Sequence, residues 1–132
     1  MKRYVQEEGS SQAHRLLKKH RILTSAISTT EATSALSRRR TVQELTAKHF
    51  AEILARIKAD RAYWELVEVS ALVLNEADEV ILKTDIRTLD AIHLASILIF
   101  QTASGIQIPF ITGDTRQREA AAHLKLDTVW VG

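Results

Sequence analysis

Short apolar segments alternate with longer segments of helical periodicity, and this alternation constrains the fold more than any other feature of the chain. The apolar and polar spacing predicts strands at 22–26, 66–70, 106–112 and 128–131, and helices at 10–20, 28–39, 41–62, 72–82, 88–103 and 117–126. Parallel strands need long crossover connections, and the helices that supply them cover the faces of the sheet. The pattern therefore predicts an α/β fold with three layers, α/β/α, around a mainly parallel sheet.

Two four-residue patterns predict where helices begin. Ser28 is followed three residues later by Glu31, and Thr41 is followed at the same distance by Glu44. This is the spacing of a capping box, in which the first side chain accepts a hydrogen bond from the backbone of the third helical residue. We expect Ser28 and Thr41 to be the N-cap residues of two helices.

The size and hydrophobic content of the chain suit one domain. It has 132 residues, of which 45% are hydrophobic, so we expect a single domain over residues 1–132. Eighteen Lys and Arg residues against 16 Asp and Glu residues give a formal charge of +2, which permits an RNA partner without indicating one. The absence of cysteine excludes disulfides and thiolate metal sites and suits a cytoplasmic protein.

The most apolar stretch, residues 91–100, is too short to span a membrane. It is interrupted by His93 and Ser96, and a spanning helix needs roughly 20 apolar residues. Lys2 and Arg3 are followed by polar and acidic residues rather than by the apolar core of a signal peptide. We expect a buried core helix, no membrane contact and no secretion.

Three acidic residues fall where strands end or helices begin. Asp114 comes two residues after the apolar segment that ends at Thr112, Asp90 lies in the first turn of the most apolar helix, and Glu31 lies near the start of another helix. Each also has a structural interpretation. Asp114 suits a helix N-cap, Asp90 is favoured by the helix dipole, and Glu31 is the partner of Ser28 in the capping box.

The functional interpretation is that these acids hold a divalent metal at one edge of the sheet, where sites form in open α/β folds. Mg²⁺ and Mn²⁺ prefer oxygen ligands, and Mg²⁺ needs only one or two carboxylates besides water and substrate phosphate. A metal lowers the pKa of its bound water and so supplies a hydroxide that can attack a phosphodiester. No side-chain nucleophile is then required.

The surroundings of these acids resemble one protein family. The segments Arg87-Thr88-Leu89-Asp90-Ala91-Ile92-His93-Leu94-Ala95 and Pro109-Phe110-Ile111-Thr112-Gly113-Asp114-Thr115-Arg116, together with the segment around Glu31, are similar to the acidic motifs of the PIN domain, in particular of VapC toxins. The resemblance implies a PIN-like fold with Glu31, Asp90 and Asp114 as catalytic, metal-holding acids. It also implies Mg²⁺ or Mn²⁺ as cofactor, endonucleolytic cleavage of RNA, dimerisation, and a cognate VapB-like antitoxin that covers the site.

The start of the chain differs from the family pattern. PIN domains begin with a central strand that carries their first Asp, and Met1–Ser10 resembles the segment that comes after that strand. The resemblance therefore predicts a domain that lacks its first strand and first acid, with weakened or absent activity. A gap in the centre of a sheet exposes strand edges, which favours a homodimer or a strand-swapped oligomer.

Basic residues near the helix ends have two interpretations. The run at 38–40 ends a predicted helix, where cations suit the dipole and a solvated terminus is a sufficient explanation. The functional interpretation makes Arg38 and Arg116 contacts to RNA phosphate. The alternative to an enzyme is a non-catalytic PIN remnant that binds an antitoxin or dimerises. A nucleotide-binding fold is disfavoured because no glycine-rich phosphate loop is present.

Overall fold

The computed structural model describes residues 22–132. The chain divides into two compact units, residues 1–65 and 66–132, and each is described by itself. The predicted helix at 10–20 and the predicted absence of a first strand lie outside the described residues. No helix among residues 22–132 is both long enough and apolar enough to cross a membrane.

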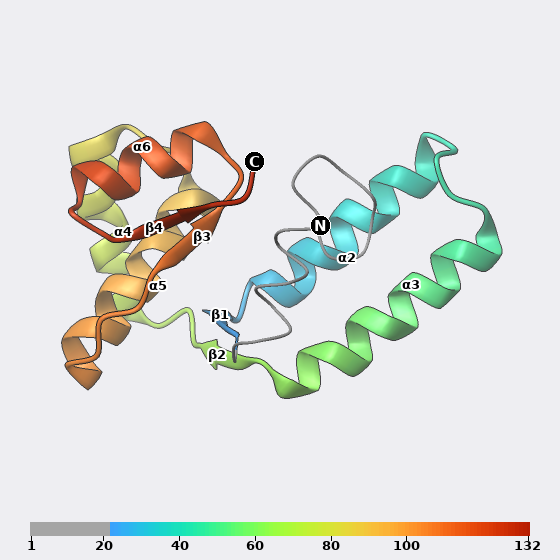
Figure 1. Ribbon diagram of the computed structural model, residues 1–132, viewed down its shortest axis with the longest axis horizontal. Coiled ribbons are helices and arrows are strands. Elements are labelled where there is room, and N and C mark those ends of the chain that lie inside the picture. The colour runs from blue at the N-terminus through green and yellow to red at the C-terminus, as the bar shows by residue number, and fades with distance from the viewer. Residues whose placement is uncertain (1–21) are drawn as a thin grey trace. The chain divides into compact units, whose positions relative to one another are not determined.

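The first unit is built on two helices, α2 (Ser28–Thr41) and α3 (Ala47–Asp60), which pack against each other and are drawn in cyan and green in Figure 1. Leu36 of α2 and Ile57 of α3 are fully buried. Near the loop between the helices, the guanidinium group of Arg40 lies 4.8 Å from the ring centroid of Phe50. Buried aliphatic side chains and this cation–π contact hold the pair together.

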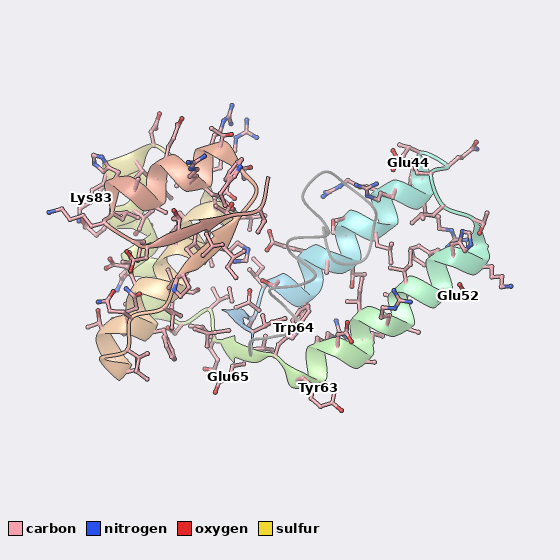
Figure 2. All side chains as sticks on the ribbon, in the orientation of Figure 1. Glu44, Glu52, Tyr63, Trp64, Glu65 and Lys83 are labelled. Atoms are coloured by element: carbon pink, nitrogen blue, oxygen red, sulfur yellow. The ribbon has the colours of Figure 1, made fainter. Side chains whose placement is uncertain are left out.

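A short strand and a 3₁₀ turn complete this unit. The strand is β1 (Leu23–Ser25), and next to it the Glu65 N–H donates to the carbonyl oxygen of Ile22 at 2.8 Å. Glu65 is the last residue of the unit and the first residue of β2 (Glu65–Val67). Between α3 and β2 the chain forms the 3₁₀ turn η1 (Arg61–Tyr63). Figure 2 shows Tyr63 pointing outward from this turn, with 83% of its surface exposed.

The prediction that Ser28 caps α2 is wrong. The N-cap residue is Ile27, and no side chain caps this helix. The Ser28 hydroxyl instead lies 2.6 Å from the hydroxyl of Thr24, so it is engaged by the preceding strand rather than by the helix backbone. Glu31 therefore lies in the first turn of α2 without a capping box.

The predicted capping box at Thr41 is also wrong. Thr41 is the last residue of α2, and its hydroxyl donates to the carbonyl oxygen of Ser37 at 3.0 Å, which continues the helix instead of starting a new one. The next helix begins after Thr46, whose side chain accepts a hydrogen bond from the His49 N–H at 3.1 Å. It ends at Asp60, where the chain tightens into η1.

The second unit alternates helices and strands. After β2 it contains α4 (Ala71–Thr84), α5 (Thr88–Ser104), β3 (Phe110–Thr112), α6 (Thr115–His123) and β4 (Thr128–Trp130). β3 and β4 are parallel, with Ile111 opposite Val129, and α6 is the crossover between them. The α/β class with parallel strands is thus confirmed, although the strands of residues 22–132 form two pairs rather than one sheet.

The strand predicted at 106–112 is shorter than expected because side chains satisfy the backbone before it. The Ile106 N–H donates to the Ser104 hydroxyl, and the Ile108 N–H donates to the side-chain carbonyl of Gln101, both at 3.1 Å. These donors are therefore not available to a strand ladder. Pairing starts only at Phe110.

The core of the second unit lies between α4 and α5. α4 buries Val73, Ala77 and Val80, which recur every three or four residues, and it packs against α5. α5 buries residues on most of its circumference, including Leu94, and is the buried helix expected from its composition. On the other helix of this unit, Arg118 of α6 lies over the ring of Trp130 of β4.

Candidate active site

Asp90 lies in the first turn of α5, the most buried helix of the second unit. This helix begins after Arg87, which has an extended backbone and provides no side-chain cap. An acid in the first turn is favoured by the dipole of the helix. Asp90 is partly exposed, so its carboxylate is anchored at the edge of the core and remains accessible from solvent.

Asp114 is the N-cap residue of α6, as its structural interpretation predicted. Its Oδ1 accepts a hydrogen bond from the Gln117 N–H at 3.1 Å. It follows β3 directly after Gly113, and its own N–H donates to the hydroxyl of Thr112 at 3.0 Å. α6 therefore starts at Thr115 rather than at 117, and it ends at His123 rather than at 126, followed by Lys125 at a positive φ of 61°.

Gln117 connects the two acids. Its side-chain amide Nε2 donates to Oδ1 of Asp90 at 2.6 Å, while its backbone N–H donates to Asp114. Its side-chain carbonyl accepts a hydrogen bond from the hydroxyl of Thr112 at 2.7 Å. One residue of α6 thus joins the end of β3, the start of α6 and the start of α5, and it brings Asp90 and Asp114 into one hydrogen-bonded cluster.

Sequence reasoning missed Gln117 and Thr112 as parts of the site. A signal for Gln117 was present, because Asp114 and Gln117 have the spacing of a capping box. In a capping box the Gln side chain returns to the N-cap backbone, whereas here it turns toward Asp90. The pattern could have marked the residue, but it does not specify the long-range partner.

A cavity of about 540 Å³ opens beside Asp90, and it lies entirely within the second unit. Its charged and titratable lining residues are Lys83, Asp85, Arg87, Asp90, Arg116, Glu119 and His123. With His123 neutral, three basic and three acidic side chains cancel, so the wall carries no net formal charge. Lys83 is exposed and extends from the end of α4 (Figure 2).

Glu31 and Arg38 belong to the first unit, on α2. Glu31 is partly buried in the first turn of α2, whereas Arg38 is exposed in its last turn and donates to the Ser34 hydroxyl at 3.4 Å. The structure therefore brings together two of the three predicted acids, Asp90 and Asp114. Of the two predicted substrate contacts, it places Arg116 in the cavity that Asp90 also lines.

The donor set of the second unit suits a hard divalent cation. Within residues 22–132 there is no group of three or more His, Asp or Glu side chains placed to hold a metal ion. Mg²⁺ nevertheless needs only one or two carboxylates, because water and substrate phosphate complete its octahedron. Asp90 and Asp114 supply two carboxylates linked through Gln117, which is the number and type of protein ligands that such an ion needs.

A comparison with protein families matches the model of the PIN domain to residues 4–123, which includes residues of both units. No curated protein matches the chain.

Proposed function

Because this chain belongs to the PIN domain family, we propose that it is a metal-dependent endoribonuclease of the VapC type. PIN domains are generally nucleases that act on RNA or DNA. The observation that carries the proposal is the bridge through Gln117, which gathers Asp90 of α5 and Asp114 of α6 into one cluster. Acids that are 24 positions apart in sequence are thereby joined through one residue at the starts of two helices.

Asp90 and Asp114 would hold Mg²⁺ or Mn²⁺, and Glu31 would be the third acid. When bound, the ion supplies an activated water that attacks the phosphodiester bond. The carboxylates orient the ion, and Gln117 and Thr112 fix the carboxylates. No serine or histidine nucleophile is needed in this scheme.

The RNA backbone would enter the cavity beside Asp90. The formal charges of the basic and acidic side chains that line the cavity cancel. A divalent ion at Asp90 would therefore make the cavity positive and favourable for phosphate. Arg116 is the proposed phosphate contact in this cavity, and Arg38 is the proposed contact from the first unit. Metal binding and RNA binding would thus reinforce each other.

The proposed partners derive from the resemblance to VapC toxins. They are a cognate VapB-like antitoxin that covers the site and a second copy of the chain, as a homodimer or a strand-swapped oligomer, in the cytoplasm. The predicted lack of a first strand and its Asp remains a prediction.

Cleavage of a structured RNA by the purified chain tests the proposal. The assay uses Mn²⁺ or Mg²⁺, a chelator control, a single-stranded DNA of the same sequence, and the variant Asp90→Asn. Asp78→Asn is a matched control, because Asp78 is an exposed acid on α4. Metal-dependent RNA cleavage that is lost in Asp90→Asn and retained in Asp78→Asn supports the enzyme.

Two other outcomes contradict it. Cleavage that persists with chelator excludes the metal mechanism. No cleavage by the purified chain with either metal ion supports instead a non-catalytic module that binds an antitoxin or dimerises.

A further inference from the structure

We propose that Gln117 is a positioning residue that orients the carboxylates of Asp90 and Asp114 for the metal. This role rests on the proposed function, because it concerns the same metal site. Gln117 itself is a neutral amide and holds the acids rather than the ion. The proposal stands on three hydrogen bonds that converge on this one residue.

The direction of the hydrogen bonds follows from the two ends of the chain, the Asp114 N–H, which can only donate, and the Asp90 carboxylate, which accepts. The Asp114 N–H can only donate, so the Thr112 oxygen that receives it acts as acceptor. The hydroxyl proton of Thr112 is then directed to the side-chain oxygen of Gln117 at 2.7 Å. With its oxygen used in this way, the amide presents its nitrogen to Asp90 and donates at 2.6 Å.

The chain of donors therefore ends on the carboxylate of Asp90. An ionised carboxylate has no proton to donate, so it acts only as an acceptor. A swapped amide would place an oxygen against the Asp90 carboxylate, a repulsive contact between two acceptors, and would take away the acceptor of the Thr112 hydroxyl proton. Thr112 is 5% exposed, so water does not readily replace its partner. The orientation of the Gln117 amide is thus set by Asp90, and it leaves the amide oxygen for the Thr112 hydroxyl.

Each of the two carboxylates uses one of its oxygens, Oδ1, to accept a hydrogen bond from Gln117. Oδ1 of Asp90 accepts from the side chain, and Oδ1 of Asp114 accepts from the backbone of the same residue. Within residues 22–132, neither Oδ2 takes part in a hydrogen bond. Both acids can therefore offer Oδ2 to a cation while Oδ1 keeps them in place, which is how outer ligands tune metal sites.

The first test is the Mn²⁺ affinity of the chain, measured by isothermal titration calorimetry. Gln117→Met keeps the length and helix propensity of the side chain and removes both of its polar contacts. We expect it to weaken Mn²⁺ binding by about 10-fold, the effect typical of an outer ligand. Gln107→Met is the matched control, because Gln107 is exposed in the loop before β3. It should leave the affinity unchanged.

A second measurement does not depend on metal. In the metal-free protein, NMR of the Gln117 side-chain amide should show slow hydrogen exchange and a shifted resonance, and both should be lost in Asp90→Ala. Thr112→Val should weaken the same two signatures, because it removes the donor to the oxygen of this amide. Gln117→Met that retains its fold by NMR yet binds Mn²⁺ about 10-fold more weakly supports the positioning role.

The role is overturned if Gln117→Met binds Mn²⁺ within twofold of the wild type while Asp90→Ala abolishes binding. That result leaves the proposed function intact. It is also overturned if the Gln117 amide is unchanged in Asp90→Ala. A wild-type chain that binds no Mn²⁺ contradicts the proposed function itself. This result is therefore distinguishable from the two results that overturn only the role of Gln117.

Discussion

The side-chain amide of Gln117 and the carboxylate of Asp90 are joined by a 2.6 Å hydrogen bond across 27 residues of sequence. The bond connects the first turn of α6 to the first turn of α5. Since Asp114 caps α6 and shares Gln117 as donor, the starts of two helices are coupled at one point. The catalytic proposal and several testable consequences depend on this coupling.

Asp114 combines a capping role with a proposed metal role, and two substitutions separate them. Asp114→Asn keeps an acceptor for the Gln117 N–H, so thermal denaturation should show nearly unchanged stability. Asp114→Ala removes the cap and should lower the free energy of unfolding by about 1 kcal/mol. Both should lose most Mn²⁺ affinity. Equal Mn²⁺ affinity in Asp114→Asn and wild type would reduce Asp114 to a helix cap.

Arg116 lines the cavity beside Asp90 and is the proposed phosphate contact of the second unit. Arg116→Gln should raise KM for RNA and leave kcat close to the wild-type value, because a contact to a phosphate other than the reacting one binds the ground and transition states alike. A plot of log RNA affinity against log salt concentration should become shallower, with its slope reduced in magnitude by about 1. Lys58→Gln on α3 is an exposed control. A fall in kcat with unchanged KM would assign Arg116 to the reaction instead.

Leu94 is fully buried in α5, four residues after the candidate metal ligand Asp90. Leu94→Ala should lower the free energy of unfolding by about 2–5 kcal/mol, from lost burial and the cavity left behind. Leu82 is 80% exposed on α4, so Leu82→Ala should change the free energy of unfolding by less than about 0.5 kcal/mol. Urea denaturation measures both. Similar effects of the two substitutions would contradict the described core.

Gly105 ends α5 with a φ of +72°, where residues with a Cβ are strained. Apart from its chain neighbours and the adjoining helix backbone, no atom of residues 22–132 lies within 4 Å of a Cβ added there, so the cost of Gly105→Ala comes from the backbone conformation. We expect a loss of about 1 kcal/mol in the free energy of unfolding. Gly105→Asn should cost less, since Asn tolerates this conformation better. If thermal denaturation shows Gly105→Ala to be more stable than Gly105→Asn, that result would contradict the positive φ assigned to Gly105.

The helices and strands were largely predictable, because apolar spacing reports which faces are buried. The helix around Leu94 and the parallel β3–β4 pair agree with such spacing. Helix starts were predicted less well. Ser28 and Thr41 carry the expected capping pattern, yet their hydroxyls bond Thr24 and Ser37 instead. A hydroxyl has several local acceptors, and the sequence pattern does not specify which one it uses.

The acids of the site could be proposed from sequence because strand ends and helix starts are local features. Asp90 and Asp114 fall at such positions, and the structure links them. The link itself was not predictable. Gln117 is neutral, its partner is remote, and its side chain turns away from the capping geometry that its spacing suggests.

The most direct test of the central claim is the Mn²⁺ affinity of three proteins: wild type, Asp90→Asn and Asp78→Asn. If Asp90 and Asp114 form a metal site, Asp90→Asn should lose Mn²⁺ affinity by at least about tenfold, since it removes a charged ligand, while the exposed Asp78→Asn behaves as wild type. Equal Mn²⁺ binding by all three proteins, with folding confirmed by circular dichroism, would contradict the account.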